Sequence, residues 1–266
     1  MRKRICIITG ASSGLGKEFA LQLSRSRNAD EIWLVARRKE KLEAIALVLE
    51  AENPRIKPRV IDLDLTGAKG LAKFTALLQG DIVIDSLVNN AGFGTYGTFM
   101  DTDIQRQLEM IELNTLSLTA LCYAVLPYMQ KGSILINVAS LAGFIPLGNF
   151  AVYGATKAYV LNFSLALAAE VADSGIFVST VCPGPVDTEF ANVASGGARQ
   201  KVVDGKNPAE VVSHCLVCIR KEKRIAIMAP KWKLKAFLSR FVSRYGFARH
   251  SFIHEKRPSK KPDPNT

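Results

Sequence analysis

The feature that most constrains this chain is an alternation of short apolar runs with helix-patterned stretches. Seven runs are rich in apolar and β-branched residues: "RICIIT", "EIWLVA", "PRVIDLDL", "DSLVNN", "GSILINVAS", "FVSTVCPG" and "RIAIMAP". Continuous apolar strands separated by helices are typical of a parallel sheet that is buried on both faces and joined by right-handed crossovers. The sequence therefore predicts an α/β fold, in which a doubly wound, mostly parallel sheet carries helices on both faces.

Six stretches between these runs have the periodicity of helices: 16–26, 39–50, 68–79, 103–129, 153–173 and 208–221. The last one has a clear start, because Asn207 is a good capping residue and Pro208 fits the first position of a helix. With 266 residues, of which 48% are hydrophobic, the chain can bury one large core. We expect a single domain over residues 1–230, followed by an extension over 231–266.

The positive charge of the chain is concentrated at its carboxyl end. The whole sequence carries +11, and residues 231–266 hold ten Lys/Arg against two Asp/Glu, so +8 lies there and +3 lies in the rest. A basic tail on a nearly neutral body indicates local electrostatic attachment and argues against specific binding of nucleic acid. The last thirteen residues, "HEKRPSKKPDPNT", are rich in Pro and Lys, and we expect them to be disordered.

The five cysteines lie among apolar neighbours, as buried thiols of a reducing compartment do. Cys215 and Cys218 form one CxxC, but no second pair or set of histidines accompanies it, so a buried helix face is favoured and no metal is expected. The apolar run after "MRKR" ends at Gly10, which is too short for a signal peptide, and no run of 18 apolar residues predicts a membrane span. We expect a cytoplasmic protein.

"TGASSGLG" follows the first apolar run and contains Gly10, Gly14 and Gly16. Glycines at a strand-to-helix turn allow backbone conformations that other residues resist, and they let a phosphate approach the positive end of the helix. The spacing differs from the GxGxxG of many dinucleotide folds, and a purely structural turn would use the same residues. Its position after the first strand nevertheless favours a Rossmann-like, dinucleotide-binding domain.

"VARRKE" closes the second apolar run and bears on the choice between NAD and NADP. In NAD-binding folds an acidic residue near this point accepts hydrogen bonds from the adenosine ribose, whereas a 2′-phosphate needs positive charge there. Arg37 and Arg38 follow Ala36 without a carboxylate, and their guanidinium groups suit that phosphate. NADP is therefore favoured over NAD. The alternative is an exposed basic helix start, with Glu40 and Lys41 on a solvated face.

"VYGATKAYV" places Tyr153 and Lys157 four residues apart on a predicted helix, so their side chains share one face. An ordinary surface pair would have the same spacing. A tyrosine titrates near 10, so proton exchange near neutral pH needs a shift of roughly three units, about 4 kcal/mol. One ammonium about 4 Å away contributes on the order of 4 kcal/mol at an effective dielectric near 20. Lys157 is therefore expected to lower the pKa of Tyr153.

These segments and several others resemble the classical short-chain dehydrogenases/reductases. The set comprises "TGASSGLG", "NNAG" at 89–92, Asn114 in "ELNTLS", Ser140 in "NVAS", the Tyr153 and Lys157 pair, and "PGPVDT" at 183–188, all in that family's order. The resemblance extends over about residues 3–230. It implies an NADP-dependent oxidoreductase that interconverts a carbonyl and a secondary alcohol, with dinucleotide and catalytic sites both within residues 1–230.

By this resemblance four residues are catalytic: Ser140, Tyr153, Lys157 and Asn114. Tyr153 would exchange the proton, Ser140 would orient the substrate oxygen, and Lys157 would also hold the nicotinamide ribose. Asn114 would act through a water linked to Lys157, although an amide within a long helix is more often a helix-bending or surface residue. The cofactor would be held by Gly10, Ser12, Ser13, Gly14, Leu15, Gly16, Arg37, Arg38, Asp64, Leu65, Asn90, Ala91, Gly92, Tyr153, Lys157, Pro183, Gly184, Val186 and Thr188.

"LAGFIPLGNF", between Ser140 and Tyr153, predicts an apolar substrate side. Such a lining suits an apolar or acyl-bearing small molecule better than a sugar, and the alternative is ordinary core packing. The family places a mobile lid at residues 189–207. The expected lining residues are Phe93, Leu141, Phe144, Ile145, Leu147, Phe150 and Phe190.

"KWKLKAFLSRFVSRYGFAR" spaces apolar residues at helical intervals, with Lys, Arg and Ser on the other faces. A basic amphipathic helix of this kind can make a peripheral contact with an anionic membrane through residues 231–250, or dock on a partner. Alternatively, its apolar stripe packs on its own domain or across a dimer. The family indicates a homodimer through the long helices that contain Asn114 and Lys157.

Two functions without catalysis are alternatives to an enzyme. One is a regulator that senses the nucleotide on the same fold, and the other is a membrane or nucleic-acid tether that acts through the basic tail. A sensor has little need for Ser140, Tyr153 and Lys157 together, and all three are present.

Overall fold

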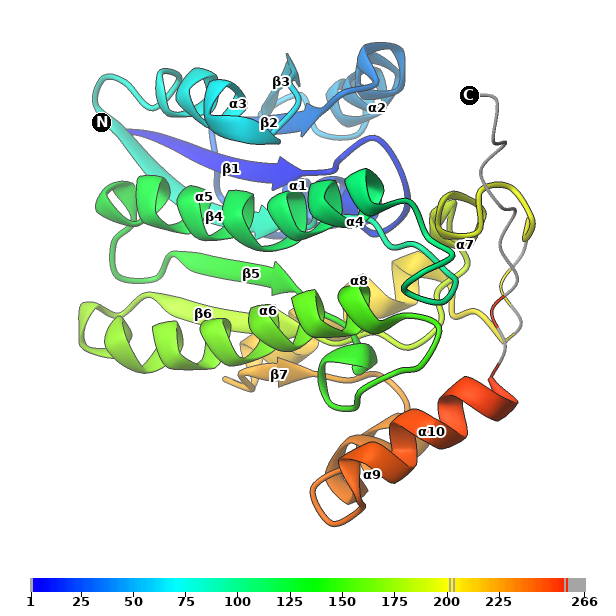
Figure 1. Cartoon of the computed structure of the whole chain (residues 1–266). Helices are drawn as coiled ribbons and strands as arrows, with labels where there is room; N and C mark the ends of the chain where they lie inside the picture. The colour runs from blue at the N-terminus through cyan, green and yellow to red at the C-terminus, as the bar shows by residue number, and fades with distance from the viewer. Residues whose placement is uncertain (1, 201, 203, 256, 258–266) are drawn as a thin grey trace.

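The centre of the computed structural model, which describes residues 2–200, 202, 204–255 and 257, is a parallel sheet. Its seven strands in the described residues are β1 (Lys3–Thr9), β2 (Glu31–Ala36), β3 (Lys57–Asp62), β4 (Ile82–Asn89), β5 (Ile134–Val138), β6 (Phe177–Val181) and β7 (Ile225–Ala226). Each of the seven apolar runs forms one of them (Figure 1). The predicted fold, a doubly wound, Rossmann-like parallel sheet in one domain, is confirmed.

The strand order β3-β2-β1-β4-β5-β6-β7 determines where a ligand can bind. The chain winds outward from β1 to β3, then crosses back to β4 on the other side of β1. Doubly wound sheets bind ligands outside the carboxyl ends of their strands, at the point where the winding reverses. β1 and β4 are hydrogen-bonded neighbours, so the residues that follow them, Gly10 and Asn90, come together at that point.

Helices cover both faces of the sheet (Figure 1). Along β1, Ile5 and Ile7 point to one face, and Cys6 and Ile8 point to the other, as the two-residue period of a strand requires. One face packs against α1 (Gly14–Ser26), α2 (Lys39–Glu52) and α8 (Pro208–Arg220), and the other packs against α3 (Gly67–Thr75), α5 (Leu118–Val125) and α6 (Ala151–Glu170). Three short elements are η3 (Leu141–Gly143), η4 (Ala172–Ser174) and α7 (Phe190–Ala194).

The single helix expected over 103–129 is a succession of shorter pieces. After α4 (Ile104–Ile111) come a π-helical turn, η1 (Glu112–Ser117), then α5, and a 3-10 turn, η2 (Leu126–Tyr128). The whole run, Ile104–Tyr128, has the length and mean hydropathy of a membrane span, although it does not contain 18 consecutive apolar residues. In the protein, 44% of its apolar window is buried. α4 contacts α6, and α5 contacts β4 and α3, so one side of this run packs against the domain.

The carboxyl-terminal extension forms two helices, which corrects the prediction of one amphipathic helix. α9 (Pro230–Leu238) ends before a turn, and Ser243 then caps α10 (Arg244–His254) by accepting a hydrogen bond from the Gly246 amide at 3.2 Å. The serines in this segment favour the break, because their hydroxyls compete for backbone amides. The predicted disorder over 254–266 falls largely outside the described residues, which include 254, 255 and 257.

Candidate active site

A cavity of about 780 Å³ opens at the carboxyl ends of the strands and unites most of the predicted site. Ser140, Tyr153 and Lys157 line it, together with the predicted cofactor residues. Among the predicted residues, all of which are described, Gly16 and Asn114 do not line it. We call the part around the glycine turn (10–16) and Arg38 the cofactor end, and the part around Phe93 and Phe150 the substrate end.

The cofactor end begins at the glycine turn between β1 and α1. Gly10 and Gly14 have φ angles of 62° and 53°, which favour glycine. A Cβ on Gly16 would lie 2.2 Å from the carbonyl oxygen of Gly10, so this glycine lets α1 pack against the turn. In the described part of the chain, Ser13 makes no side-chain capping bond at the start of α1. The first amides of α1 therefore remain available to an anion, and the turn fits the pyrophosphate of a dinucleotide.

Asn90 joins the end of β4 to the glycine turn. Its Nδ2 donates to the carbonyl oxygens of Thr9 and Gly10, both at 3.1 Å. The Thr9 hydroxyl in turn accepts from the amides of Asn90 and Ala91, each at 3.0 Å. These bonds hold "NNAG" against the turn, which fixes the wall of the cofactor end.

Arg38 lies at the far side of the glycine turn and already has an acidic partner. Its guanidinium donates to Ser12 Oγ at 3.0 Å and Ser13 Oγ at 2.8 Å, and it pairs with Glu189 Oε2 at 2.7 Å. Lys41 Nζ lies 2.6 Å from the other oxygen of Glu189. Hydrogen bonds from Lys41 and Arg38 lower the pKa of Glu189 to about 2. A carboxylate thus occupies a two-cation site of the kind that suits a phosphate.

Arg37 is placed differently from Arg38. Its Nη1 lies 3.6 Å from Asp64 Oδ2, and both side chains are well exposed. The other oxygen of Asp64 accepts from the amide and the hydroxyl of Thr66, at 3.0 and 2.8 Å. Asp64 and Leu65 line the cavity beside Arg37, as expected of residues near an adenine.

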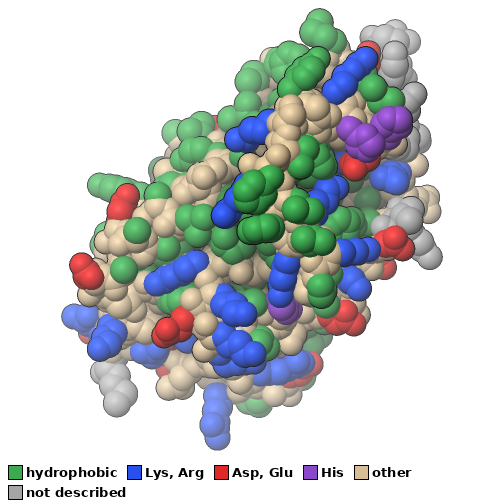
Figure 2. Space-filling model, turned by 90° about the horizontal axis from the view of Figure 1, so that it is seen from below, with side chains coloured by type: hydrophobic (Ala, Val, Ile, Leu, Met, Phe, Trp, Pro, Cys, Tyr) green, Lys and Arg blue, Asp and Glu red, His purple; other side chains and the backbone are tan. Residues whose placement is uncertain are grey.

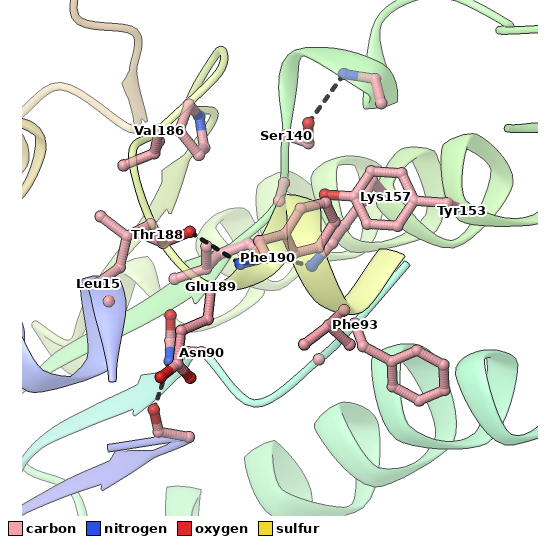
Figure 3. Close-up of a pocket in the computed structure, with 18 of the residues that line it drawn as sticks. Leu15, Asn90, Phe93, Ser140, Tyr153, Lys157, Val186, Thr188, Glu189 and Phe190 are labelled. Atoms are coloured by element: carbon pink, nitrogen blue, oxygen red, sulfur yellow. Dashed lines mark hydrogen bonds between the residues drawn. The ribbon is translucent and has the colours of Figure 1, made fainter. Parts of the chain in front are cut away.

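Tyr153 and Lys157 lie one turn apart on α6, and Ser140 stands opposite them at the end of β5 (Figure 3). The Ser140 side chain lies near enough to the Tyr153 hydroxyl to oppose the rise in its pKa. It also accepts a hydrogen bond from the Ala142 amide at 3.1 Å. Lys157 Nζ donates to the Val138 carbonyl at 2.8 Å and lies 5.7 Å from the centre of the Tyr153 ring. All three predicted polar groups therefore meet in one place.

The electrostatics of this group differ from the prediction. Burial raises the pKa of Tyr153, and the Ser140 side chain opposes that rise without reversing it. Burial also lowers the pKa of Lys157 to about 8. The expectation that Lys157 alone makes the phenol more acidic is therefore wrong for this arrangement, because loss of solvent around the phenol outweighs the effect that lowers its pKa.

Asn114 is buried in the π-helical turn η1, behind the cavity wall. Its amide donates to the Phe93 carbonyl at 2.9 Å and to Thr156 Oγ1 at 3.1 Å, and its Oδ1 accepts from the Phe93 amide at 3.1 Å. A Cβ on Gly92 would lie 2.7 Å from Asn114 Oδ1 and 3.6 Å from Lys157 Nζ. Asn114 thus holds the 92–93 backbone beside Lys157 instead of being a surface residue.

The substrate end is walled by aromatic rings. Phe150 stacks on Tyr153 with ring centres 4.1 Å apart, and Phe190 and Tyr96 tilt against this pair. All seven apolar residues predicted for the substrate side line the cavity. The end is therefore apolar close to the Tyr153 hydroxyl.

The model of the short chain dehydrogenase family matches residues 4–197 of this sequence, which is well over half of the chain. The chain belongs to the short-chain dehydrogenase/reductase family. It is an NAD(P)-dependent oxidoreductase of that family, built on the family's parallel sheet.

Relatives with assigned activities are similar over most of this dehydrogenase. An NADP-dependent 3-hydroxy acid dehydrogenase of Schizosaccharomyces pombe is 37% identical over 201 residues, which cover 73% of this chain and 76% of the relative. A short-chain dehydrogenase from Sphingobium yanoikuyae, solved in complex with NADPH, is 30% identical, with a TM-score of 0.78 over 98% of this chain and 99% of that one. A bulky-bulky ketone specific alcohol dehydrogenase from Comamonas testosteroni is 28% identical, with a TM-score of 0.74 over 91% and 93%.

Several lining residues of this dehydrogenase were not predicted from its sequence. Glu189 completes the cofactor end and pairs with Lys41 behind it, and the substrate end also contains Tyr96, Arg106, Arg199, Trp232, Lys235, Glu255 and Arg257. The extension supplies four of these, because it folds back over the domain: Asn149 Nδ2 donates to the Phe252 carbonyl at 3.1 Å. A Cβ on Gly148 would lie 2.5 Å from Phe252 Cβ, so Gly148 permits this close approach, which nothing in the local sequence announces.

Proposed function

We propose that this dehydrogenase uses NADP(H) to interconvert a bulky, mainly apolar ketone and its secondary alcohol, with Tyr153 as the proton donor and acceptor. The observation that carries the proposal is the meeting of the Tyr153 hydroxyl with Ser140 and Lys157 in the same cavity as the glycine turn. A single cavity can therefore hold a nicotinamide nucleotide and a carbonyl compound side by side.

The three polar residues divide the work on the substrate oxygen. When bound, NADPH supplies the hydride that reduces the carbonyl carbon. Tyr153 donates its hydroxyl proton to the carbonyl oxygen as that oxygen gains charge, and it takes the proton back in the oxidative direction. Ser140, which lines the cavity beside Tyr153, holds the same oxygen in line with the phenol. Lys157 places positive charge beside the phenolate that remains, which stabilises it.

NADP is proposed over NAD because of the cations at the cofactor end. Arg38 and Lys41 converge on one carboxylate, so they can converge on a 2′-phosphate in its place, and Arg37 stands nearby. β2 ends in Ala36 without the acidic residue that an NAD ribose uses. The NADPH complex of the Sphingobium relative and the NADP dependence of the Schizosaccharomyces relative support this choice.

A bulky apolar substrate is proposed from the rings around Tyr153. Phe93, Phe144, Ile145 and Phe150 offer aromatic and branched surfaces and no sugar-binding array. The Comamonas relative, specific for ketones with two bulky substituents, supports this class. A nucleotide sensor without chemistry is the second candidate, and no observed contact favours it over the enzyme.

A panel assay tests the proposal. NADPH consumption is followed with aryl alkyl ketones, decalones, aldehydes and 3-oxoacyl thioesters, and NADH replaces NADPH in parallel. We expect turnover with bulky ketones and a lower KM for NADPH than for NADH. Tight NADPH binding without turnover of any carbonyl, or of the corresponding alcohols with NADP, would favour the sensor.

We also propose a homodimer in a reducing, cytoplasmic compartment. Five apolar side chains on α4, η1, α5 and α6 are exposed in the single chain: Leu108, Ile111, Leu116, Tyr123 and Tyr159. A second copy would cover them along the long helices, which is the arrangement predicted from the sequence. All five cysteines are buried free thiols, as suits a reducing compartment. Light scattering of the wild type and of Leu116→Glu tests the dimer, since that change should give a monomer.

A further inference from the structure

The substrate end carries more positive charge than an apolar ketone needs. Apart from Lys157, the charged side chains among the described residues that line it are four cations and one carboxylate: Arg106, Arg199, Lys235 and Arg257, and Glu255. Glu255 is shared, because it lies 3.0 Å from Arg257 and 3.7 Å from Lys235. One carboxylate therefore serves two cations within the wall.

Two of these cations lie close to the reacting position. The guanidinium of Arg257 lies 5.4 Å from the centre of the Phe150 ring, and Phe150 stacks on Tyr153. The ring centre of Tyr96 is 4.8 Å from that of Phe150. Burial raises the pKa of Tyr96, and the charges of Arg257 and Arg199 oppose that rise. Both arginines therefore lie near Tyr96 in the cavity wall, and Tyr96 packs against the ring that stacks on the proton donor.

Arg199 is left without a counter-ion. It is half-buried at the cavity wall, and no carboxylate in the described ranges forms an ion pair with it, whereas Arg106 pairs with Glu109 at 3.2 Å. A guanidinium that is partly removed from water gains most from an anionic partner with two oxygens, because its planar fork matches a carboxylate. The free space beside Arg199 is the cavity itself.

We propose that the substrate bears a carboxylate that Arg199 and Arg257 bind, so that the enzyme acts on bulky oxo acids and hydroxy acids. This rests on the proposed function, because it assigns the second end of the same substrate. The apolar middle of the molecule lies against Phe150, its carbonyl lies at Tyr153, and its carboxylate replaces water at the two arginines. A sulfonate of the same shape shares this chemistry and forms a separate arm of the test.

Matched substrates test the proposal. An aryl oxo acid, its methyl ester and its sulfonate analogue are compared by kcat/KM with the full-length wild type. We expect kcat/KM for the acid to exceed that for the ester by about tenfold to a hundredfold, which corresponds to the free energy of hydrogen bonds to a charged group. In Arg199→Gln and Arg257→Gln the acid-to-ester ratio should fall toward one, while exposed Arg55→Gln keeps the wild-type ratio.

The outcomes separate this proposal from the proposed function. Equal kcat/KM for acid and ester in the wild type, or an unchanged ratio in both arginine variants, overturns the carboxylate site and leaves a bulky ketone reductase. A sulfonate that exceeds the carboxylate overturns the choice of anion. Absence of turnover with every carbonyl overturns the proposed function itself.

A second, independent observation concerns the outer face of the extension, which Figure 2 views from below. Trp232 and Ala236 of α9 face the cavity. The apolar side chains on the other side of α9 and in the turn after it are exposed to solvent. Phe241 and Tyr245 are 73% and 80% exposed. The exposed apolar set, which we call the outer face, is Leu234, Phe237, Leu238, Phe241, Val242 and Tyr245.

The charges around the outer face identify what can cover it. Lys231, Lys233, Arg240, Arg244 and Arg249 are exposed, and residues 231–254 contain no Asp or Glu. A second copy seated here by two-fold symmetry would bring these cations against their own copies without a carboxylate between them, which is repulsive. An anionic surface with an apolar interior has the opposite complementarity.

The geometry points to an anionic lipid bilayer as the partner of the outer face. The aromatic rings enter the interface and the flanking Lys and Arg bind lipid headgroups. Because α9 forms both the outer face and a wall of the cavity, such docking places the substrate end next to the lipid surface.

Vesicle sedimentation with the full-length protein tests this. We expect binding to phosphatidylcholine vesicles that contain phosphatidylserine and not to phosphatidylcholine alone, and a loss of at least about tenfold in Phe237→Ser/Phe241→Ser and in Arg240→Gln/Arg244→Gln. Leu47→Ser, an equally exposed apolar residue on α2, should bind as the wild type does. Equal binding to both vesicles overturns the proposal. Binding to neither vesicle also overturns it. Light scattering of the phenylalanine variants would then show whether the outer face is a dimer interface instead.

Discussion

The two ends of the cavity are built in different ways. The cofactor end consists of turns and hydrogen bonds that directly follow β1, β2 and β4, so the sheet itself places them. The substrate end is a wall of rings and cations from five segments that are distant in the chain: the loop at 93–96, α4, residues 141–150, residues 190–199 and the extension. Nucleotide binding is therefore tied to the sheet, whereas substrate choice is free to change with the loops and the extension.

The strongest way to break this comparison is to remove the group where the ends meet. Tyr153→Phe keeps the ring that stacks on Phe150 and deletes the hydroxyl, so turnover should fall by about 10²–10⁴-fold. The dissociation constant for NADPH, measured by fluorescence titration, should stay within about twofold of the wild-type value. Such a change corresponds to a binding free energy difference far below the 1.4 kcal/mol of a tenfold change. Tyr128→Phe is the matched control, because that hydroxyl bonds the Leu78 carbonyl away from the cavity. A large loss of NADPH affinity would mean that the ends are not separate.

Lys157 lies between the two ends, and the pH dependence of stability tests its burial. Its pKa is about 8 in the folded protein against 10.5 for an ordinary lysine, so the unfolded chain binds more protons between these values. The cost of the buried charge is complete below pH 8 and disappears as the pH rises toward 10.5. Relative to Lys157→Met, the free energy of unfolding of the wild type should rise by up to about 3 kcal/mol over this range.

Urea unfolding at several pH values measures this difference. Lys73→Met serves as the control, because Lys73 is exposed on α3 and its variant should parallel the wild type. Parallel curves for the wild type and Lys157→Met would show that Lys157 is not desolvated. In that case water reaches Lys157, and the two ends of the cavity are not separated by a buried lysine.

What could be predicted from the sequence follows the same division. Gly10 and Gly14 were identified because a tight turn after a strand imposes a local requirement, and Tyr153 and Lys157 because four residues on a helix share a face. The pKa of Tyr153 was predicted to fall, but burial raises it, and burial is a property of the whole fold.

Glu189 and Arg257 escaped prediction for a related reason. Glu189 finds Arg38 across 151 positions of the chain, and Arg257 reaches the Gly148 carbonyl across 109 positions. No periodicity or motif encodes such pairings, which depend on how the segment after β6 and the extension pack. The two helices in place of one at 230–254 have the same origin, since helical spacing does not reveal where a serine cap interrupts a helix.

A smaller effect sharpens the assignment of the cofactor end. Arg38→Ala removes one of the two cations that converge on Glu189, so the KM for NADPH should rise by about tenfold to a hundredfold, as the loss of a bond to a charged group does. The KM for NADH should change little, because NADH has no 2′-phosphate. Steady-state kinetics with both cofactors give the ratio, and exposed Arg55→Ala is the control. Equal losses for both cofactors would assign Arg38 to the pyrophosphate or to the fold.

The smallest effect tests whether the two ends communicate. Glu189 holds Arg38 and Lys41, and it directly precedes α7, so it links the phosphate site to the wall that carries Phe190. Because its pKa is held at about 2, a change of pH near neutrality does not release the cations, and a competing anion must displace the carboxylate. Glu189→Gln removes that competition, and NADPH should bind up to about fivefold more tightly, within the range of exposed ion pairs. Glu43→Gln, which loses an exposed pair with Lys39, is the control.

The KM for the ketone in Glu189→Gln then decides whether the ends communicate. If this KM is unchanged, the ends are independent. If it rises while NADPH binds more tightly, the ion pair holds α7 in place, and cofactor binding adjusts the substrate wall.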